Sequence, residues 1–341
     1  MNSPRPGPWG APLGTACFKQ RPEDFRVREQ LGFEATGQGE HLLLRVEKRG
    51  MTTHELIDEL ARSTGIPARQ IGYAGLKDKH AVTEQWLSLQ LPGQREMPEF
   101  PEAQDWRVLE AHWHDRKLRV GAHRGNAFVV LLREVEADRT AVKERLVQIR
   151  RHGFANYFGE QRFGQSGDNV ARALKALAGA RSRKRLSRNR RSLYISSLRS
   201  ELFNRVLARR IEQGIWEQPL EGDVWMLDGS GSWFREEADE ALLERYRNGD
   251  LHSGIGLYGC GESPLAGPAA ALEQSVYAEA GKMVQCLQQM DARYGLRPHR
   301  ARATDLEFHW QDEQTLEIRV HLGRGSYLTS LLEQVFDLST R

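Results

Sequence analysis

The sequence Gly72-Tyr73-Ala74-Gly75-Leu76-Lys77-Asp78-Lys79-His80 runs from a short apolar segment, which predicts a strand, into a loop that contains a glycine. The loop carries one carboxylate, Asp78, between two lysines. Cations on both sides favour the ionised carboxylate, and an ionised aspartate suits a nucleophile or a base that works beside a polyanion. Taken alone, a Lys-Asp-Lys turn is more often an exposed loop with weak ion pairs. A catalytic role for Asp78 therefore depends on the motifs around it.

Two further motifs combine aromatic and polar side chains in a way that suits an unstacked base. In the segment 124–128 a glycine opens a predicted strand on which Asn126 and Phe128 face the same side. An amide beside an aromatic ring is a combination that RNA-binding proteins use to hold a single base. Residues 156–164 add three aromatic residues, an arginine and two glycines. The alternatives are a core phenylalanine after a turn and an ordinary domain junction.

The periodicity of the apolar residues changes twice along the chain. The first 150 residues alternate as in strands, apart from a helix that we expect to begin at Thr52 or Thr53 and to end at Gly65. From Ala141 to about residue 300 the spacing becomes helical, most clearly over 192–213. The pattern predicts an α+β fold with a helical insert. Strands are expected at 25–29, 41–47, 71–74, 85–90, 106–112, 126–135 and 315–322, and a short hairpin at 224–234.

Composition excludes several classes of protein. The chain has 341 residues, of which 39% are apolar and 28% are charged, and its mean hydropathy is −0.61. Together with the lack of an apolar run of about 18 residues, these values exclude a membrane span. The first residues do not resemble a secretory signal, and the three cysteines are too few and too scattered for a disulfide framework. A cytoplasmic location is therefore expected.

Basic residues are concentrated in two segments, although the formal net charge is only +3. Such clusters suit phosphate contacts, whereas a solvated basic surface is the alternative for either cluster alone. The presence of two favours RNA or DNA as a partner. The first cluster contains Arg181, Arg183, Lys184, Arg185, Arg188, Arg190 and Arg191, and the second contains Arg116, Lys117, Arg119, His123 and Arg124.

The candidate motifs for metal, nucleotide-cofactor and hydrolase chemistry are incomplete in this sequence. His54-Glu55 begins like a zinc protease helix, but Asp58 stands where the second histidine is needed. His112 and His114 share a strand face without a third ligand nearby in the sequence. The glycines of 256–261 follow neither a phosphate-loop nor a dinucleotide pattern, and we expect a flexible loop there. No metal site is expected.

Five motifs in order resemble the tRNA pseudouridine synthase D (TruD) family. The resemblance extends from residue 19 to about residue 335, and the five motifs in register are far more specific than any one of them. The motifs are Lys19 with Pro22-Glu23-Asp24-Phe25; Gly75-Leu76-Lys77-Asp78-Lys79-His80-Ala81-Val82-Thr83-Glu84-Gln85; Gly125-Asn126-Ala127-Phe128; Asn156-Tyr157-Phe158-Gly159 with Gln161-Arg162-Phe163-Gly164; and Gly325-Ser326-Tyr327-Leu328-Thr329.

The resemblance implies a pseudouridine-synthase catalytic domain, with a mixed and mostly antiparallel sheet and flanking helices. It assigns residues 1–152 and 303–341 to this domain, and 153–302 to an inserted, largely helical TRUD domain. The implied reaction converts uridine in tRNA, at position 13, to pseudouridine without a metal, nucleotide or redox cofactor. The implied partner is tRNA, and we expect a monomer that does not bind membranes.

The resemblance also implies roles for individual residues. Asp78 corresponds to the essential aspartate, which attacks C1′ as a nucleophile or deprotonates the ribose, and Lys19 to a basic position that keeps it charged. Phe25, Phe128 and Asn126 correspond to residues that hold the flipped-out uracil, whose loss of stacking such groups offset. Tyr327 stands where the family commonly has phenylalanine, so stacking is retained and a hydroxyl is added. The basic run at 181–191 is expected to contact tRNA.

Two readings from other classes remain at this stage. A non-catalytic tRNA-binding or RNA-folding protein could use the same basic clusters and aromatic residues, and would not need Asp78. A glycosidase-like hydrolase of free nucleosides would ordinarily need paired acids, and it would leave the basic run unexplained.

Overall fold

The computed structural model describes residues 5–93, 96–101, 103–164, 167–177, 186–290 and 292–339. The chain divides into two compact units, each with its own sheet and core. The first, called the sheet unit, comprises Gly14–Asp138, Ala303–Gly325 and Phe336–Arg341. The second, called the helical unit, comprises Met1–Leu13, Arg139–Arg302 and Ser326–Val335.

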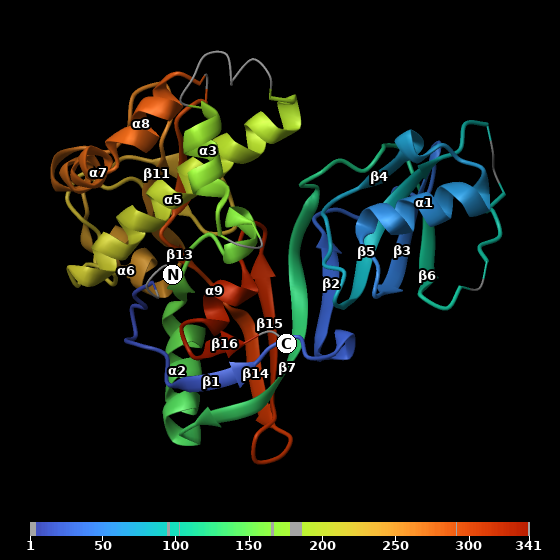
Figure 1. Cartoon of the computed structure of the whole chain (residues 1–341), viewed down its shortest axis with the longest axis horizontal. Coiled ribbons are helices and arrows are strands. Elements are labelled where there is room, and N and C mark those ends of the chain that lie inside the picture. Colours follow the sequence, from blue (N-terminus) through green and yellow to red (C-terminus); the bar gives the residue numbers. More distant parts are fainter. Residues whose placement is uncertain are drawn as a thin grey trace. The chain divides into compact units, whose positions relative to one another are not determined.

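A mixed sheet dominates the sheet unit (Figure 1). Its main path has the order β14-β15-β7-β2-β5-β3-β6, while β1 pairs with β7 and β16, and β4 pairs with β5. Among the described strand pairs, β2 with β5 and β1 with β16 are parallel and the others are antiparallel, which confirms the mixed, mostly antiparallel sheet. The strands are β1 (Gly14–Cys17), β2 (Phe25–Leu31), β3 (His41–Arg49), β4 (Ile71–Tyr73), β5 (Val82–Gln90), β6 (Trp106–His114), β7 (His123–Ala137), β14 (Thr304–Trp310), β15 (Leu316–Gly323) and β16 (Asp337–Ser339).

Helix α1 (Thr53–Thr64) covers one face of this sheet (Figure 1). Its N-terminus is capped by Thr52, whose hydroxyl accepts from the Glu55 N–H, and its C-terminus ends at Gly65 with φ +70°. The buried side of α1 packs on apolar residues of β3 and β5 such as Leu44 and Leu87. The predicted start and end of this helix are confirmed. Short 3-10 turns occupy Pro22–Asp24 and Ala68–Gln70.

Strand pairing assigns side chains to this covered face, here called the α1 face. Val27 of β2 is in register with Phe128 of β7 and with Thr83 of β5, and paired residues point the same way. Since residues alternate along each strand, Phe25 and Glu29 also belong to the α1 face. Phe128 is therefore on the same side of the sheet as the helix.

The helical unit is built around helix α5, which packs on α3, α7, α8 and β11. A small sheet of order β10-β9-β11-β12 and a β8-β13 pair complete it. The helices are α2 (Arg139–His152), α3 (Asn169–Leu177), α5 (Arg188–Glu212), α6 (Glu240–Asn248), α7 (Gly267–Glu279), α8 (Gly281–Gln288) and α9 (Leu328–Leu332), with a 3-10 turn at Glu160–Phe163. The strands are β8 (Phe154–Ala155), β9 (Trp225–Leu227), β10 (Trp233–Phe234), β11 (Leu251–Leu257), β12 (Gly295–Pro298) and β13 (Arg300–Ala301).

The segment expected to be a flexible loop, 256–261, begins within a strand. Gly256 and Leu257 end β11 and pair with Leu296 and Gly295 of β12. A Cβ at Gly256 would lie 2.3 Å from the Tyr294 hydroxyl. At this position glycine permits close packing rather than flexibility, which is why the loop prediction was wrong there.

The compact units and the predicted domain boundaries separate the chain at different points. Helix α2 and residues 326–335 belong to the helical unit, whereas the sequence assigns both to the catalytic domain. One reason for their place is the buried Arg145 of α2, whose guanidinium donates to the carbonyl oxygen of Gln334 at 2.6 Å. The catalytic and TRUD domain boundaries stay a prediction.

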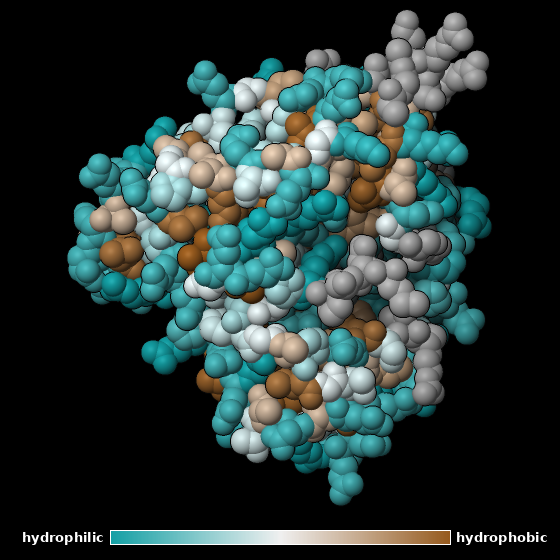
Figure 2. Space-filling model, turned by 60° about the vertical axis from the view of Figure 1, so that its left-hand side comes forward, coloured by the Kyte–Doolittle hydropathy of each residue, from teal (hydrophilic) through white to brown (hydrophobic). Residues whose placement is uncertain are grey.

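The molecular surface is largely hydrophilic. On the face drawn in Figure 2, hydrophobic residues lie in separate small patches among polar ones. In the described part of the chain no helix combines the length and the apolar character needed to cross a membrane. Large hydrophobic side chains that are exposed include Phe33, Leu76, Val120 and Trp233.

Candidate active site

Asp78 lies in the loop of residues 74–80, here called the Asp78 loop, between β4 and β5. Its carboxylate accepts a hydrogen bond from Lys19 Nζ at 2.6 Å, and the two side chains are 33% and 15% exposed. The carboxylate is thus paired with a cation and still reachable from solvent. The contact expected between Lys19 and Asp78 is present in the structure.

Lys19 is held in an unusual backbone conformation above aromatic rings. Its φ is +60°, a left-handed value that costs a side-chain-bearing residue about 1 kcal/mol or more. Its ammonium lies 4.2 Å from the ring centroid of Phe25 and 5.0 Å from that of Phe18, within cation–π range. Strain of this kind persists where the surroundings fix a residue for function.

Phe25 and Phe128 form the platform beneath this ion pair. Their rings stack with centroids 6.0 Å apart and planes 16° from parallel. Both are largely buried, at 5% and 9% exposure. The structure therefore brings Asp78, Lys19, Phe25 and Phe128 together on the α1 face, although only a small part of either phenylalanine is open to solvent.

Asn126 is located on β7 two residues before Phe128, so both side chains point to the α1 face. Its Oδ1 atom is buried and accepts no hydrogen bond from the residues that the structure describes. A buried carbonyl oxygen of this kind ordinarily has a donor. The Asn126 Oδ1 atom is thus an acceptor that no described residue uses.

Tyr327 belongs to the helical unit. Its hydroxyl accepts from the Arg162 guanidinium at 3.2 Å, and its ring lies 6.1 Å from that of Phe158. Gly159 allows this approach, because a Cβ there would lie 2.9 Å from the Thr329 hydroxyl. The motifs at 156–164 and 325–329 are thus in contact, and the added hydroxyl of Tyr327 forms a hydrogen bond with Arg162.

The basic run is described only in part. Arg188, Arg190 and Arg191 are exposed in the first turn of α5, whose N-terminus is capped by Ser187. Cations at this end of a helix are disfavoured by the helix dipole. Arg181, Arg183, Lys184 and Arg185 lie outside the described residues.

Lys48, which the sequence analysis did not single out, supports the Asp78 loop. Its side chain is fully buried in β3, and its ammonium donates to the carbonyl oxygens of Asp78 at 2.8 Å and Met51 at 2.6 Å. Burial lowers the pKa of Lys48 to about 8, although the nearby Asp78 charge opposes the change. A lysine near a strand end gives no sequence signal of such a role, because exposed lysines are common there.

The stability of the protein is expected to rise with pH through Lys48. Its pKa is about 8 when folded and 10.5 ordinarily, so between these values the unfolded chain binds more protons here and stability increases with pH. When the pH is raised from 7 to 10, the unfolding free energy of wild type should rise by about 2 to 3 kcal/mol relative to that of Lys48→Met. Urea unfolding of both proteins at the two pH values measures this shift. A difference that stays constant would contradict the titration of Lys48.

No group of three or more metal-ligating side chains that could hold an ion occurs in the described ranges. The groups that surround the Asp78 carboxylate are an ammonium partner, stacked rings and an amide.

Comparison with known proteins gives a consistent family. The family model described as "tRNA pseudouridine synthase D (TruD)" matches residues 13–177 and 165–335. The tRNA pseudouridine synthase D of Xanthomonas axonopodis pv. citri is 41% identical, over 97% of this chain and 94% of that protein. The Methylococcus capsulatus protein of the same name is 40% identical, over 93% of this chain and 89% of its own length.

A solved structure shows the same fold. It is a putative tRNA pseudouridine synthase D from Methanosarcina mazei, which aligns with a TM-score of 0.76 at 21% identity and covers 96% of this chain and 94% of its own. The protein is thus a pseudouridine synthase, with the α+β fold expected from the sequence. The chain belongs to the tRNA pseudouridine synthase D family. It is an isomerase that converts uridine to pseudouridine in tRNA.

Proposed function

We propose that Asp78 is the residue on which this isomerisation depends. The observation that carries the proposal is the solvent-accessible Asp78 carboxylate, which Lys19 holds at 2.6 Å above stacked phenylalanines. An ionised carboxylate is needed whether Asp78 attacks C1′ of the ribose as a nucleophile or removes a proton from the sugar. Lys19 favours that ionised form as its charge partner.

The reaction keeps every heavy atom of the base and exchanges one proton with solvent. The N1–C1′ bond of uridine breaks, the uracil turns within the site, and a bond forms between C5 and C1′. The C5 proton is lost to solvent and N1 gains one, so the product is an isomer of the substrate. No oxidant, reductant or cofactor enters this balance, and we propose that the enzyme works without a metal.

We further propose that the uracil is flipped out of the RNA and held by Phe25, Phe128 and Asn126. We also propose that Tyr327 of the helical unit contacts the substrate. Aromatic rings and hydrogen-bonding groups offset the few kcal/mol lost on unstacking a base. The buried Oδ1 of Asn126 suits the N3–H donor of uracil, since no described residue donates to it. A hydrogen bond from uracil N3–H to Asn126 Oδ1 would distinguish uracil from cytosine, because N3 of cytosine carries no hydrogen.

The basic residues at the start of α5 are proposed to contact the tRNA backbone. Arg188, Arg190 and Arg191 are exposed where the helix dipole disfavours them, and phosphate groups would compensate both the charges and the dipole. We include Arg181, Arg183, Lys184 and Arg185 in this contact because they belong to the same run. We also propose a cytoplasmic monomer with its catalytic domain at 1–152 and 303–341 and its TRUD insert at 153–302.

Position 13 is the proposed target within tRNA. The test uses two tRNA transcripts that carry tritium at C5 of every uridine. They differ only at position 13, where one has uridine and the other cytidine. We expect the enzyme to release tritium from the uridine-13 transcript and not from its partner. Equal release from both would place the modified uridine elsewhere.

A further inference from the structure

A buried ion pair lies immediately beneath the Asp78 loop and takes no part in the chemistry described above. Lys77, the residue before Asp78, pairs through its ammonium with the Glu29 carboxylate of β2. The Lys77 and Glu29 side chains are 6% and 0% exposed. Charges this deeply buried persist when they are paired and their remaining hydrogen-bonding atoms are satisfied.

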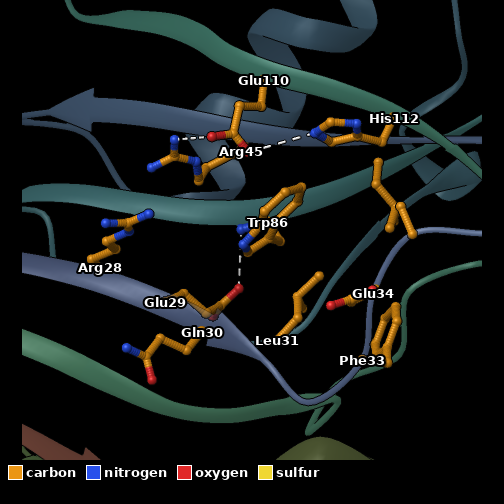
Figure 3. A pocket seen from close by; sticks show the side chains of 12 residues that line it. Arg28, Glu29, Gln30, Leu31, Phe33, Glu34, Arg45, Trp86, Glu110 and His112 are labelled. Carbon is orange, nitrogen blue, oxygen red and sulfur yellow. Dashed lines mark hydrogen bonds and ion pairs between the residues drawn. The ribbon is translucent and has the colours of Figure 1, made fainter.

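Glu29 occupies the point where two strands of the sheet separate. β2 and β5 pair in parallel over only three residues on each strand, from Arg26 with Val82 to Arg28 with Glu84. Just beyond, one carboxylate oxygen of Glu29 accepts from the backbone N–H of Trp86 at 3.0 Å, as Figure 3 shows, and the other faces Lys77. Glu29 therefore links β2, β5 and the Asp78 loop.

Glu29 is also the link to the other side of the proposed uracil site. Its partner across the antiparallel β2-β7 pair is Asn126. Glu29 is thus linked to Asn126 through the pairing of their strands and to the loop that carries Asp78 through its own carboxylate.

The backbone of the Asp78 loop is anchored at Lys77. The Lys77 N–H donates to the Thr53 hydroxyl at 2.9 Å, and that hydroxyl donates to Gln85 Oε1 at 3.0 Å. Gly75 leaves room for the pair: a Cβ there would lie 3.1 Å from Lys77 Nζ and 3.2 Å from Glu29 Oε2. Contacts of this length require a neighbour to move by a few tenths of an ångström.

Glu29 also lines the pocket drawn in Figure 3, several of whose charged side chains form ion pairs within the protein. Arg45, which lines the pocket, pairs with Glu110 and with Glu84. The positive charge of Arg45 is thus balanced by these two carboxylates of the protein. Glu29 lines the same pocket, and its carboxylate is directed away to Trp86 N–H and Lys77.

We propose that Glu29 is a positioning residue for the reaction: through its buried ion pair with Lys77 it holds the Asp78 carboxylate in register with Asn126. The inference rests on the proposed role of Asp78. A displacement of about 1 Å in a reacting group can cost roughly 100-fold in rate, so loss of the pair slows the chemical step far more than it weakens tRNA binding.

The test compares Glu29→Gln, Lys77→Met, the double variant and Gly75→Ala in single-turnover tritium release from tRNA labelled at uracil C5. Arg28→Gln is the matched control, because Arg28 neighbours Glu29 on the opposite face and forms only a surface pair with Glu84. Thermal unfolding establishes that each variant is folded, and filter binding gives its Kd for tRNA. Asp78→Asn is measured beside them.

We expect Glu29→Gln to lower the rate by about 30-fold or more, with Kd within about twofold of wild type. The double variant should be no slower than the slower single variant, because both substitutions remove one interaction. Gly75→Ala, which keeps both charges, should slow the reaction by about tenfold.

Three results would overturn the positioning role: a folded Glu29→Gln with the rate of Arg28→Gln, losses that multiply in the double variant, or a Kd that rises as much as the rate falls. If Glu29→Gln does not fold, Gly75→Ala and Lys77→Met decide by the same criteria. If Asp78→Asn keeps the wild-type rate, the proposed role of Asp78 fails instead.

Discussion

Asp78→Asn is expected to abolish pseudouridine formation, with a loss of at least about 10³-fold in single-turnover rate. Asparagine has the size and shape of aspartate, so the loop, its contact with Lys48 and the Lys77–Glu29 ion pair are retained. What disappears is the negative charge, without which the side chain can neither attack C1′ nor remove a proton. Chromatography of nucleosides from digested tRNA measures the product.

Binding of tRNA separates a chemical role for Asp78 from a structural one. Because the substitution removes an anion beside a polyanion, the Kd of Asp78→Asn for tRNA should equal that of wild type or be somewhat lower. A parallel loss of binding and of product would show that Asp78 supports the fold or the interface rather than the chemistry.

Lys19→Met is expected to give the second largest loss, about 10²-fold in the single-turnover rate. Methionine keeps an unbranched side chain as far as Cε, which can still pack on Phe18 and Phe25, and it bears the same left-handed backbone strain as lysine. The difference between the two proteins therefore reports the ammonium that pairs with Asp78 at 2.6 Å. The single-turnover rates of wild type and Lys19→Met are measured over a range of pH.

Lys19→Arg is the conservative control for this prediction. Arginine preserves the positive charge, so part of the lost rate should return. Equal rates for wild type and Lys19→Met across the pH range would rule out Lys19 as the charge partner of Asp78.

Local patterns in the sequence predicted much of the sheet unit. Helix α1 was recognisable from local signals, because the Thr52 hydroxyl caps its start and Gly65 ends it in a left-handed conformation. The strands were recognisable by alternation. β3 extends beyond its predicted range because its last two residues, Lys48 and Arg49, are charged and do not continue the apolar pattern, although Lys48 is buried. In the helical unit, by contrast, β11 and β12 pair residues that are 38 or more positions apart, and short sequence windows contain no signal of that contact.

The site shows the same division between local and distant information. The resemblance indicated Asp78, Lys19, Phe25, Asn126 and Phe128. The sheet unit brings these five residues, from the Asp78 loop, the segment after β1, β2 and β7, to one face. The resemblance did not indicate Lys48 or Glu29. Their roles depend on burial and on partners 30 and 48 residues away, which become visible only when the strands are assembled. The substrate roles of these residues, and of Tyr327 in the helical unit, stay predictions.

The central claim is that this chain forms pseudouridine in tRNA by means of Asp78. The most direct measurement is tritium release to water from tRNA labelled at uracil C5, with wild type, Asp78→Ala and Arg28→Gln at equal concentrations. The account predicts that wild type and Arg28→Gln release tritium until one uridine per tRNA has reacted, and that Asp78→Ala, although folded and bound to tRNA, releases none. Release by Asp78→Ala at the wild-type rate would contradict the assignment of Asp78, and no release by any of the three would contradict the reaction on that tRNA.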